Sequence, residues 1–164
     1  MENGRLGTAA AMYRVRTRNY DKQDQAMRWR LPDRVFFACG ACHILAHAFL
    51  ERHGRPGMAV LWIRPASGYT GNHLVVVTDR WVFDYHGYVD RQRYFDHVRR
   101  VAVRRWPGWN AALVEVPADV LLSTPKSRRH GMWLREPGDF LHDPLPRART
   151  YLDRFPAPAC PAGS

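Results

Sequence analysis

Apolar residues recur at helical spacing in the segment that follows "CGAC", and this pattern predicts a helix over residues 42–53. The apolar face of this helix would carry Cys42, Leu45, Ala46, Phe49 and Leu50. Gly54 follows as a C-terminal stop, with Pro56 two positions beyond it. The segment is therefore expected to be a helix that packs by one side on the core.

Three short apolar runs after this helix are predicted to be strands: 58–65, 72–77 and 81–85. "TDR" at 78–80 is a turn signal, so the second and third strands are expected to pair as a hairpin. "HGY" at 86–88 is expected to end the third strand.

The rest of the chain is less regular. Asp90 is expected to cap a helix that runs to about residue 99, with Tyr94, Phe95 and Val98 on its inner face. We expect a strand at 111–116, an irregular wrap over 123–146 and a terminal helix at 146–155; residues 1–30 are polar and weakly patterned. The order of elements predicts an α+β domain, with a helix packed on a mostly antiparallel sheet.

The length of 164 residues, 46% of them apolar, suits one domain with one core. We expect a single domain over residues 1–155 and a disordered tail at 156–164. No apolar run approaches the length of a membrane span, and the N-terminus lacks a secretory signal. These features predict a cytoplasmic protein, although an effector exported by another route would look the same.

The three cysteines are too few for a disulfide framework, and Cys160 falls in the predicted tail. Cys39 and Cys42 are expected to be thiols in a reducing compartment. The net charge of +10 comes almost wholly from arginine and favours acidic partners, such as an acidic protein or nucleic acid. Because the arginines are scattered in short clusters, nucleic-acid binding stays a less favoured alternative.

Cys42 has the position of a nucleophile. A cysteine attacks acyl carbons as its thiolate, which the positive end of a helix and a neighbouring histidine both stabilise. The Cys42 N–H is also one of the free donors at a helix start and can face a developing oxyanion. His73 and Asp84 lie on the two strands of the predicted hairpin and are candidates for the base and the group that orients it.

The loop length decides whether His73 and Asp84 meet. With a two-residue loop at Asp79-Arg80, Asp84 lies opposite Val75, and His73 is its diagonal neighbour on the same face. A four-residue loop would bring the two directly opposite each other, whereas a three-residue loop would place their side chains on different faces. Asp79 is a rival orienting group, but its position in "TDR" is typical of a solvated turn.

The order Cys, strand, His, Asp in "CHILAHAFLERHG…MAVLWI…NHLVVVTDRWVFDY" resembles the transglutaminase-like group of the papain-like superfamily. "CGAC" is also similar to the run in papain-type proteases whose second Cys is the nucleophile, which selects Cys42 over Cys39. The resemblance covers residues 36–86. It implies a papain-like or transglutaminase-like core and acyl transfer through a thioester by Cys42, His73 and Asp84, without a metal or organic cofactor.

The sequence departs from that resemblance around the oxyanion hole. Papain-type enzymes place a Gln six residues before the nucleophile, where this chain has Phe36. Asn72 and Trp81 are candidates for the second donor, and His86 is a candidate for lining the cleft.

Other interpretations stay open. Cys42 could be a small buried core residue. His73 could be an ordinary histidine of a strand, and Asp84 could cap a turn. Cys39, Cys42, His43 and His47 fit zinc chemistry, but four ligands within nine residues would have to wrap the metal with a broken helix. In the simpler interpretation, His43, His47 and Glu51 form the polar side of the helix.

The favoured prediction is thus a thiol-dependent enzyme, either a cysteine protease, an amidase or deamidase, or a cross-linking transferase. Its substrate would be a peptide or protein amide. The alternatives are a non-catalytic binding protein on the same scaffold and a basic nucleic-acid-binding protein.

Overall fold

The computed structural model describes residues 15–159 of the chain, and its centre is a five-stranded antiparallel sheet. The strand order is β4-β3-β2-β1-β5. The bounds are β1 Ala59–Pro65, β2 His73–Val77, β3 Trp81–Asp84, β4 Gly87–Asp90 and β5 Ala111–Val116. The predicted α+β class with an antiparallel sheet is confirmed.

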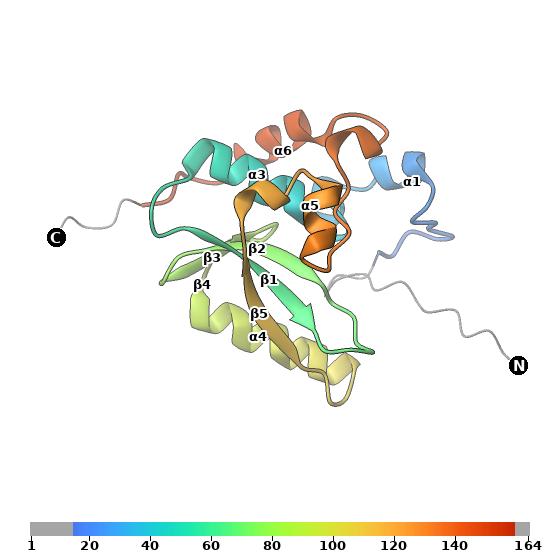
Figure 1. Cartoon of the computed structure of the whole chain (residues 1–164). Helices are drawn as coiled ribbons and strands as arrows, with labels where there is room; N and C mark the ends of the chain where they lie inside the picture. Colours follow the sequence, from blue (N-terminus) through green and yellow to red (C-terminus); the bar gives the residue numbers. More distant parts are fainter. Residues whose placement is uncertain (1–14, 160–164) are drawn as a thin grey trace, which may run out of the picture.

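Helices cover both faces of this sheet, so the domain has three layers (Figure 1). Helix α4 (Arg91–Arg105) packs on one face, and α3 (Cys42–His53) lies on the other. The remaining helices are α1 Gln25–Trp29, α2 Asp33–Ala38, α5 Thr124–Arg129 and α6 Pro144–Leu152, with short 3₁₀ turns at Ala118–Val120 and Pro137–Asp139. Within the described residues, no helix is long and apolar enough to cross a membrane.

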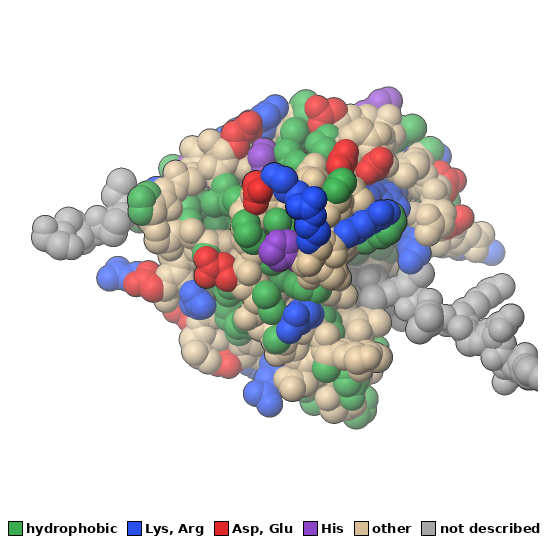
Figure 2. Space-filling model, in the orientation of Figure 1, with side chains coloured by type: hydrophobic (Ala, Val, Ile, Leu, Met, Phe, Trp, Pro, Cys, Tyr) green, Lys and Arg blue, Asp and Glu red, His purple; other side chains and the backbone are tan. Residues whose placement is uncertain are grey.

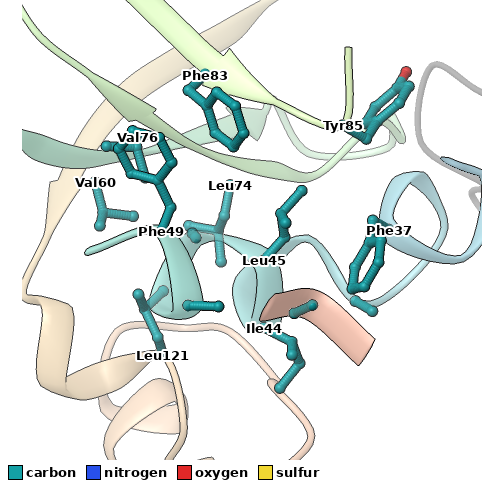
Figure 3. Close-up of a cluster of buried hydrophobic side chains, with 14 of the residues drawn as sticks. Phe37, Ile44, Leu45, Phe49, Val60, Leu74, Val76, Phe83, Tyr85 and Leu121 are labelled. Carbon is teal, nitrogen blue, oxygen red and sulfur yellow. The ribbon is translucent and has the colours of Figure 1, made fainter. Parts of the chain in front are cut away.

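The sequence of strand β2 is apolar after His73 because the strand is buried on both faces. All five of its residues are buried, because alternate side chains enter two different cores. Leu74 and Val76 pack on the α3 side, whereas Val75 and Val77 pack on the α4 side. Figure 3 shows part of the α3-side cluster, in which Phe49 is stacked on Phe83 with ring centroids 4.3 Å apart.

The predicted helix over 42–53 is confirmed with the same bounds. Gly54 ends it as expected, but with φ −57° rather than in a left-handed conformation. A Cβ at this position would lie 2.4 Å from the Leu50 carbonyl oxygen, so the close approach of the backbone is what requires glycine. The strands predicted at 58–65, 72–77, 81–85 and 111–116 are also present, within one residue at each end.

Strand β3 ends before "HGY" as predicted, but the chain stays in the sheet. Tyr85 and His86 form a tight turn, and the chain returns as β4, with Asp84 opposite Gly87. Gly87 has φ +93°, a backbone conformation that glycine adopts freely and residues with a side chain rarely adopt. A break in the apolar pattern therefore marked a second hairpin.

Asp90 caps α4 as predicted, with its Oδ1 accepting from the Arg93 N–H at 2.9 Å, but the helix continues to Arg105. The segment 123–146 is more regular than expected because it contains α5, which Ser123 caps. The N-terminal α1 and α2 were not predicted, since helices of five and six residues carry little periodicity.

Residues 156–159, which were expected to be part of a disordered tail, contact the domain. The Tyr88 hydroxyl donates to the Pro156 carbonyl at 2.9 Å, and Arg55 donates to the Ala159 carbonyl. These contacts hold residues 156–159 against the domain. The remainder of the predicted tail, with Cys160, lies outside the described residues.

Candidate active site

The β2–β3 hairpin brings His73 and Asp84 together. Its register pairs Val76 with Phe83 and Val77 with Val82, and it closes with the predicted two-residue turn. In this register His73 Nε2 lies 3.1 Å from Asp84 Oδ2, and both side chains are buried. Of the loop lengths considered, the two-residue turn is the one found, and the His73–Asp84 hydrogen bond that it allows is present.

Asp84 accepts hydrogen bonds from two further residues. The Tyr94 hydroxyl, from α4, donates to Oδ2 at 2.6 Å. The backbone N–H of His86 lies 2.8 Å from Oδ1, and its Nδ1 lies 3.0 Å from the same oxygen. Burial disfavours the carboxylate, but the hydrogen bonds from His73 and His86 outweigh it and hold the Asp84 pKa below its usual range. Asp84 is thus a fixed negative charge behind His73.

Tyr94 was predicted to be a core residue and not part of the site. The signal was nevertheless present, since a phenol on the buried face of a helix needs a partner for its hydroxyl. Burial and the adjacent Asp84 raise the Tyr94 pKa well above its usual value, so Tyr94 remains a donor.

Cys42 is the first residue of α3 and is half-buried. Burial opposes ionisation of the thiol, but hydrogen bonds with His43 and His73 outweigh it and lower the pKa of Cys42 to about 5. The helix start adds its positive dipole end and N–H groups that lack partners within the helix. The surroundings of Cys42 therefore favour its thiolate form.

His73 is held as the positive partner of this thiolate. Burial disfavours the imidazolium, but the hydrogen bond with Asp84 and the interaction with the adjacent Cys42 thiolate raise the pKa of His73 to about 10. Nε2 is engaged by Asp84, while Nδ1 makes no well-aligned hydrogen bond among the described residues. Nδ1 is therefore the nitrogen that remains for exchanging a proton with the thiol.

Cys39 has the opposite character. It follows the last residue of α2, and burial, together with the Cys42 charge, raises its pKa to about 11 against a smaller effect of Arg28. The structure thus separates the two thiols in the same direction as the sequence prediction.

The prediction that His43 belongs to an exposed polar side of the helix is wrong. His43 is only 2% exposed, because segments from both ends of the chain pack against α3 on the side away from the sheet. Its Nε2 donates to the Arg135 carbonyl at 2.9 Å, which links the helix start to the C-terminal third. Only Glu51 of the expected polar side makes a surface ion pair, with Arg149.

A pocket of about 590 Å³ opens beside Cys42 and His73. Its wall combines segments that lie far apart in the sequence: Val15, Tyr20, Lys22, Arg28, residues 38–40, Trp62, residues 72–74 and residues 131–135. Residues 131–135 belong to the segment predicted as an irregular wrap. That segment therefore forms part of the wall beside the thiol.

The three weaker site predictions have different outcomes. Asn72 lies on the pocket wall, and its Oδ1 accepts from the Trp62 indole N–H at 2.9 Å. This bond fixes the amide, so that the Asn72 Nδ2 remains to donate to a ligand. His86 lies behind the site, against Asp84, and does not line the pocket.

Trp81 is not near the thiol. It begins β3 at the turn end of the hairpin and packs against Phe49 and Tyr88, with ring centroids 6.0 Å and 5.2 Å away. A role for Trp81 in an oxyanion hole is therefore wrong. Phe36, at the position where papain-type enzymes have Gln, is buried in the core and offers no donor.

The zinc interpretation finds no support in the part of the chain that is described. No group of three or more His, Cys, Asp or Glu side chains is placed there to hold a metal ion. Cys42 and His43 interact with each other, and Nε2 of His43 is occupied by a backbone carbonyl.

Searches against protein-family models, curated proteins and solved structures found no match to this chain.

Proposed function

We propose that this protein is a thiol-dependent acyl-transfer enzyme in which Cys42 is the nucleophile, His73 the acid and base, and Asp84 the orienting group. The observation that supports the proposal most is the hydrogen-bonded His73–Asp84 pair beside a low-pKa thiol on a pocket wall. A buried structural cysteine would have a raised pKa and no need of a pocket. This arrangement is also what the resemblance to the transglutaminase-like and papain-like enzymes implies.

In the proposed reaction, the Cys42 thiolate attacks the carbonyl carbon of an amide or ester. The carbonyl electron pair moves to oxygen, where the Cys42 N–H and the Asn72 amide are the candidate donors. When the intermediate collapses, the bond to the leaving nitrogen or oxygen breaks, and the His73 imidazolium supplies the proton that the leaving group takes. A thioester on Cys42 remains.

The thioester is then transferred to water or an amine. Neutral His73 takes a proton from the attacking group, and collapse of the second intermediate releases the acid or the new amide together with the Cys42 thiolate. Asp84 stays ionised throughout, because its role is to stabilise the imidazolium. Water as acceptor would make the protein a protease, amidase or deamidase, whereas an amine would make it a cross-linker.

The test is acylation by a p-nitrophenyl ester. We expect a burst of nitrophenol equal to the enzyme concentration and an acyl adduct on Cys42 that can be trapped at low pH for mass spectrometry. The burst should vanish in Cys42→Ala and persist in Cys39→Ala, the matched control. Release of the acyl group in water alone and with added amine then distinguishes hydrolysis from transfer.

A slow reaction without a burst, equal in Cys42→Ala and the wild type, would contradict the proposal. It would leave a non-catalytic binding protein on this scaffold as the better interpretation. Nucleic-acid binding is not favoured. Figure 2 shows the basic side chains of one face interspersed with acidic and apolar ones, and several arginines are paired, as in Arg52–Asp153 and Arg149–Glu51.

A further inference from the structure

The pocket beside Cys42 has a charge imbalance that the proposed acyl transfer does not use. Three cationic side chains line it: Lys22, Arg28 and Arg135. No Asp or Glu is found among its lining residues in the described part of the chain. The wall beside the thiol is therefore positive even apart from His73.

Arg28 is the most unusual of these cations, because it is only 8% exposed. Its Nε is buried and has no hydrogen-bond partner, and none of the ion pairs among residues 15–159 involves it. Its guanidinium lies over Gly40, where an added Cβ would be 3.5 Å from Nη1. A buried guanidinium without a carboxylate is costly for folding, and a charge kept at that cost in a pocket points to a ligand.

Arg135 lies near enough to Arg28 for the two charges to interact. Burial and the Arg28 charge lower the Arg135 pKa, and Tyr20 and Asp139 offset this only in part. The Arg135 Nη1 is also buried and has no hydrogen-bond partner among the described residues. The hydrogen bond from His43 to the Arg135 carbonyl fixes this residue beside the start of α3.

We propose that Arg28 and Arg135 form an oxyanion-binding subsite, and that the acyl substrate of Cys42 carries a carboxylate or phosphate near the bond that is attacked. This inference rests on the proposed function and adds a substrate class to it. Guanidinium groups present planar pairs of N–H donors that match these anions, and a bound anion would satisfy the unpartnered nitrogens of both arginines. Lys22 would add a third positive charge at the same wall.

A pair of alkylating reagents that differ by one charge tests the subsite. N-iodoacetyl-β-alanine carries a carboxylate, and N-iodoacetyl-β-alaninamide is its neutral match. In both, the Cys42 sulfur displaces iodide. We compare their second-order rates at Cys42, by peptide mass, in the wild type, Arg28→Gln and Arg135→Gln. Arg104→Gln, on exposed α4 surface, is the control.

We expect the preference for the acidic reagent to fall about tenfold in Arg28→Gln and Arg135→Gln, the size of one hydrogen bond to a charged group. It should stay unchanged in Arg104→Gln. The rate with the neutral amide in each variant corrects for any change in thiol ionisation, so the ratio of the two rates is the quantity compared. Since the His73 imidazolium attracts anions in every variant, the difference between variants is the measurement, not the wild-type preference itself.

A second measurement on the wild type covers the case in which Arg28→Gln does not fold. Glutarate and inorganic phosphate are each tested for protection of Cys42 against the neutral reagent, and the better protector identifies the anion. An unchanged preference in Arg135→Gln, together with no protection by either anion, overturns the subsite. Failure of the proposed function looks different: the neutral amide would then label Cys42 slowly, and at the same rate in His73→Ala.

Discussion

Replacing His73 with alanine tests whether the imidazolium is what ionises Cys42. The Cys42 pKa is about 5 in the intact site, against 9.0 for an ordinary thiol. At about pH 6 the thiolate fraction would be about nine-tenths in the wild type and about one-thousandth in a variant whose pKa returned fully to the ordinary value, which is the limiting case because His43 also lowers the Cys42 pKa. The gain in thiolate is therefore close to a thousandfold at this pH.

The gain in rate is smaller, because a less basic thiolate is a weaker nucleophile. With a Brønsted coefficient of about 0.45, a pKa lower by about four units reduces the intrinsic rate about 60-fold. Iodoacetamide should then label the wild type about 15-fold faster than His73→Ala at about pH 6, and about 50-fold slower at about pH 9.5. The two pH–rate profiles should cross at about pH 7. Burial raises the thiol pKa in the variant, whereas the retained His43 hydrogen bond lowers it and narrows the difference at low pH.

The assay is the second-order alkylation rate at Cys42, read by peptide mass spectrometry between about pH 5 and pH 10. His97→Ala, on exposed α4 surface, controls for the loss of an imidazole elsewhere. Profiles of wild type and His73→Ala that run parallel, each rising toward an ordinary thiol pKa, would refute the reasoning. Crossing profiles in His73→Ala but not in His97→Ala would support the ion pair.

Three further outcomes follow from contacts around the site. Tyr94→Phe should lower the free energy of unfolding by about 1.5–3 kcal/mol, measured in urea, because it removes the donor to the Asp84 carboxylate; an unchanged value would mean that water replaces the hydroxyl. Phe49→Ala should cost about 3–5 kcal/mol in the same assay, since this ring is fully buried and stacked on another; a loss below about 1 kcal/mol would contradict that packing. Cys39→Ser should leave the alkylation rate of Cys42 at about pH 6 unchanged within about twofold, because the Cys39 pKa is about 11; a large loss of Cys42 labelling would contradict the assignment of the reactive thiol.

The hairpin that carries His73 and Asp84 could be predicted because its geometry is local. A two-residue turn fixes the register, and the period of two along each strand then fixes the face of every side chain. The same rules missed β4, since the tight turn at Tyr85 and His86 depends on the conformation of Gly87. A glycine after a polar break indicates a turn without showing whether the chain returns to the sheet.

The pocket could not be predicted, because its parts come from distant positions. Arg28 and Arg135 are more than a hundred residues apart in the sequence, yet they lie near each other on one wall. The burial of His43 has the same origin, as the helix pattern showed one apolar face and gave no sign that residues 131–135 would cover another. Periodicity indicates that a face is buried, but it does not identify what covers a face that carries polar residues.

The hydrogen bonds around Asp84 also bear on whether the His73–Asp84 pair has a purely structural role. Tyr94 and His86 each supply a donor to one carboxylate oxygen, and His73 adds the hydrogen bond that lowers the Asp84 pKa most. Nδ1 of His73 makes no aligned hydrogen bond among the described residues, so this nitrogen stays open on the side of the ring away from Asp84. A structural histidine would bond through both nitrogens or give way to an apolar residue. An imidazole oriented from behind by Asp84 and left open toward a thiol on a pocket wall is what proton transfer to and from Cys42 requires.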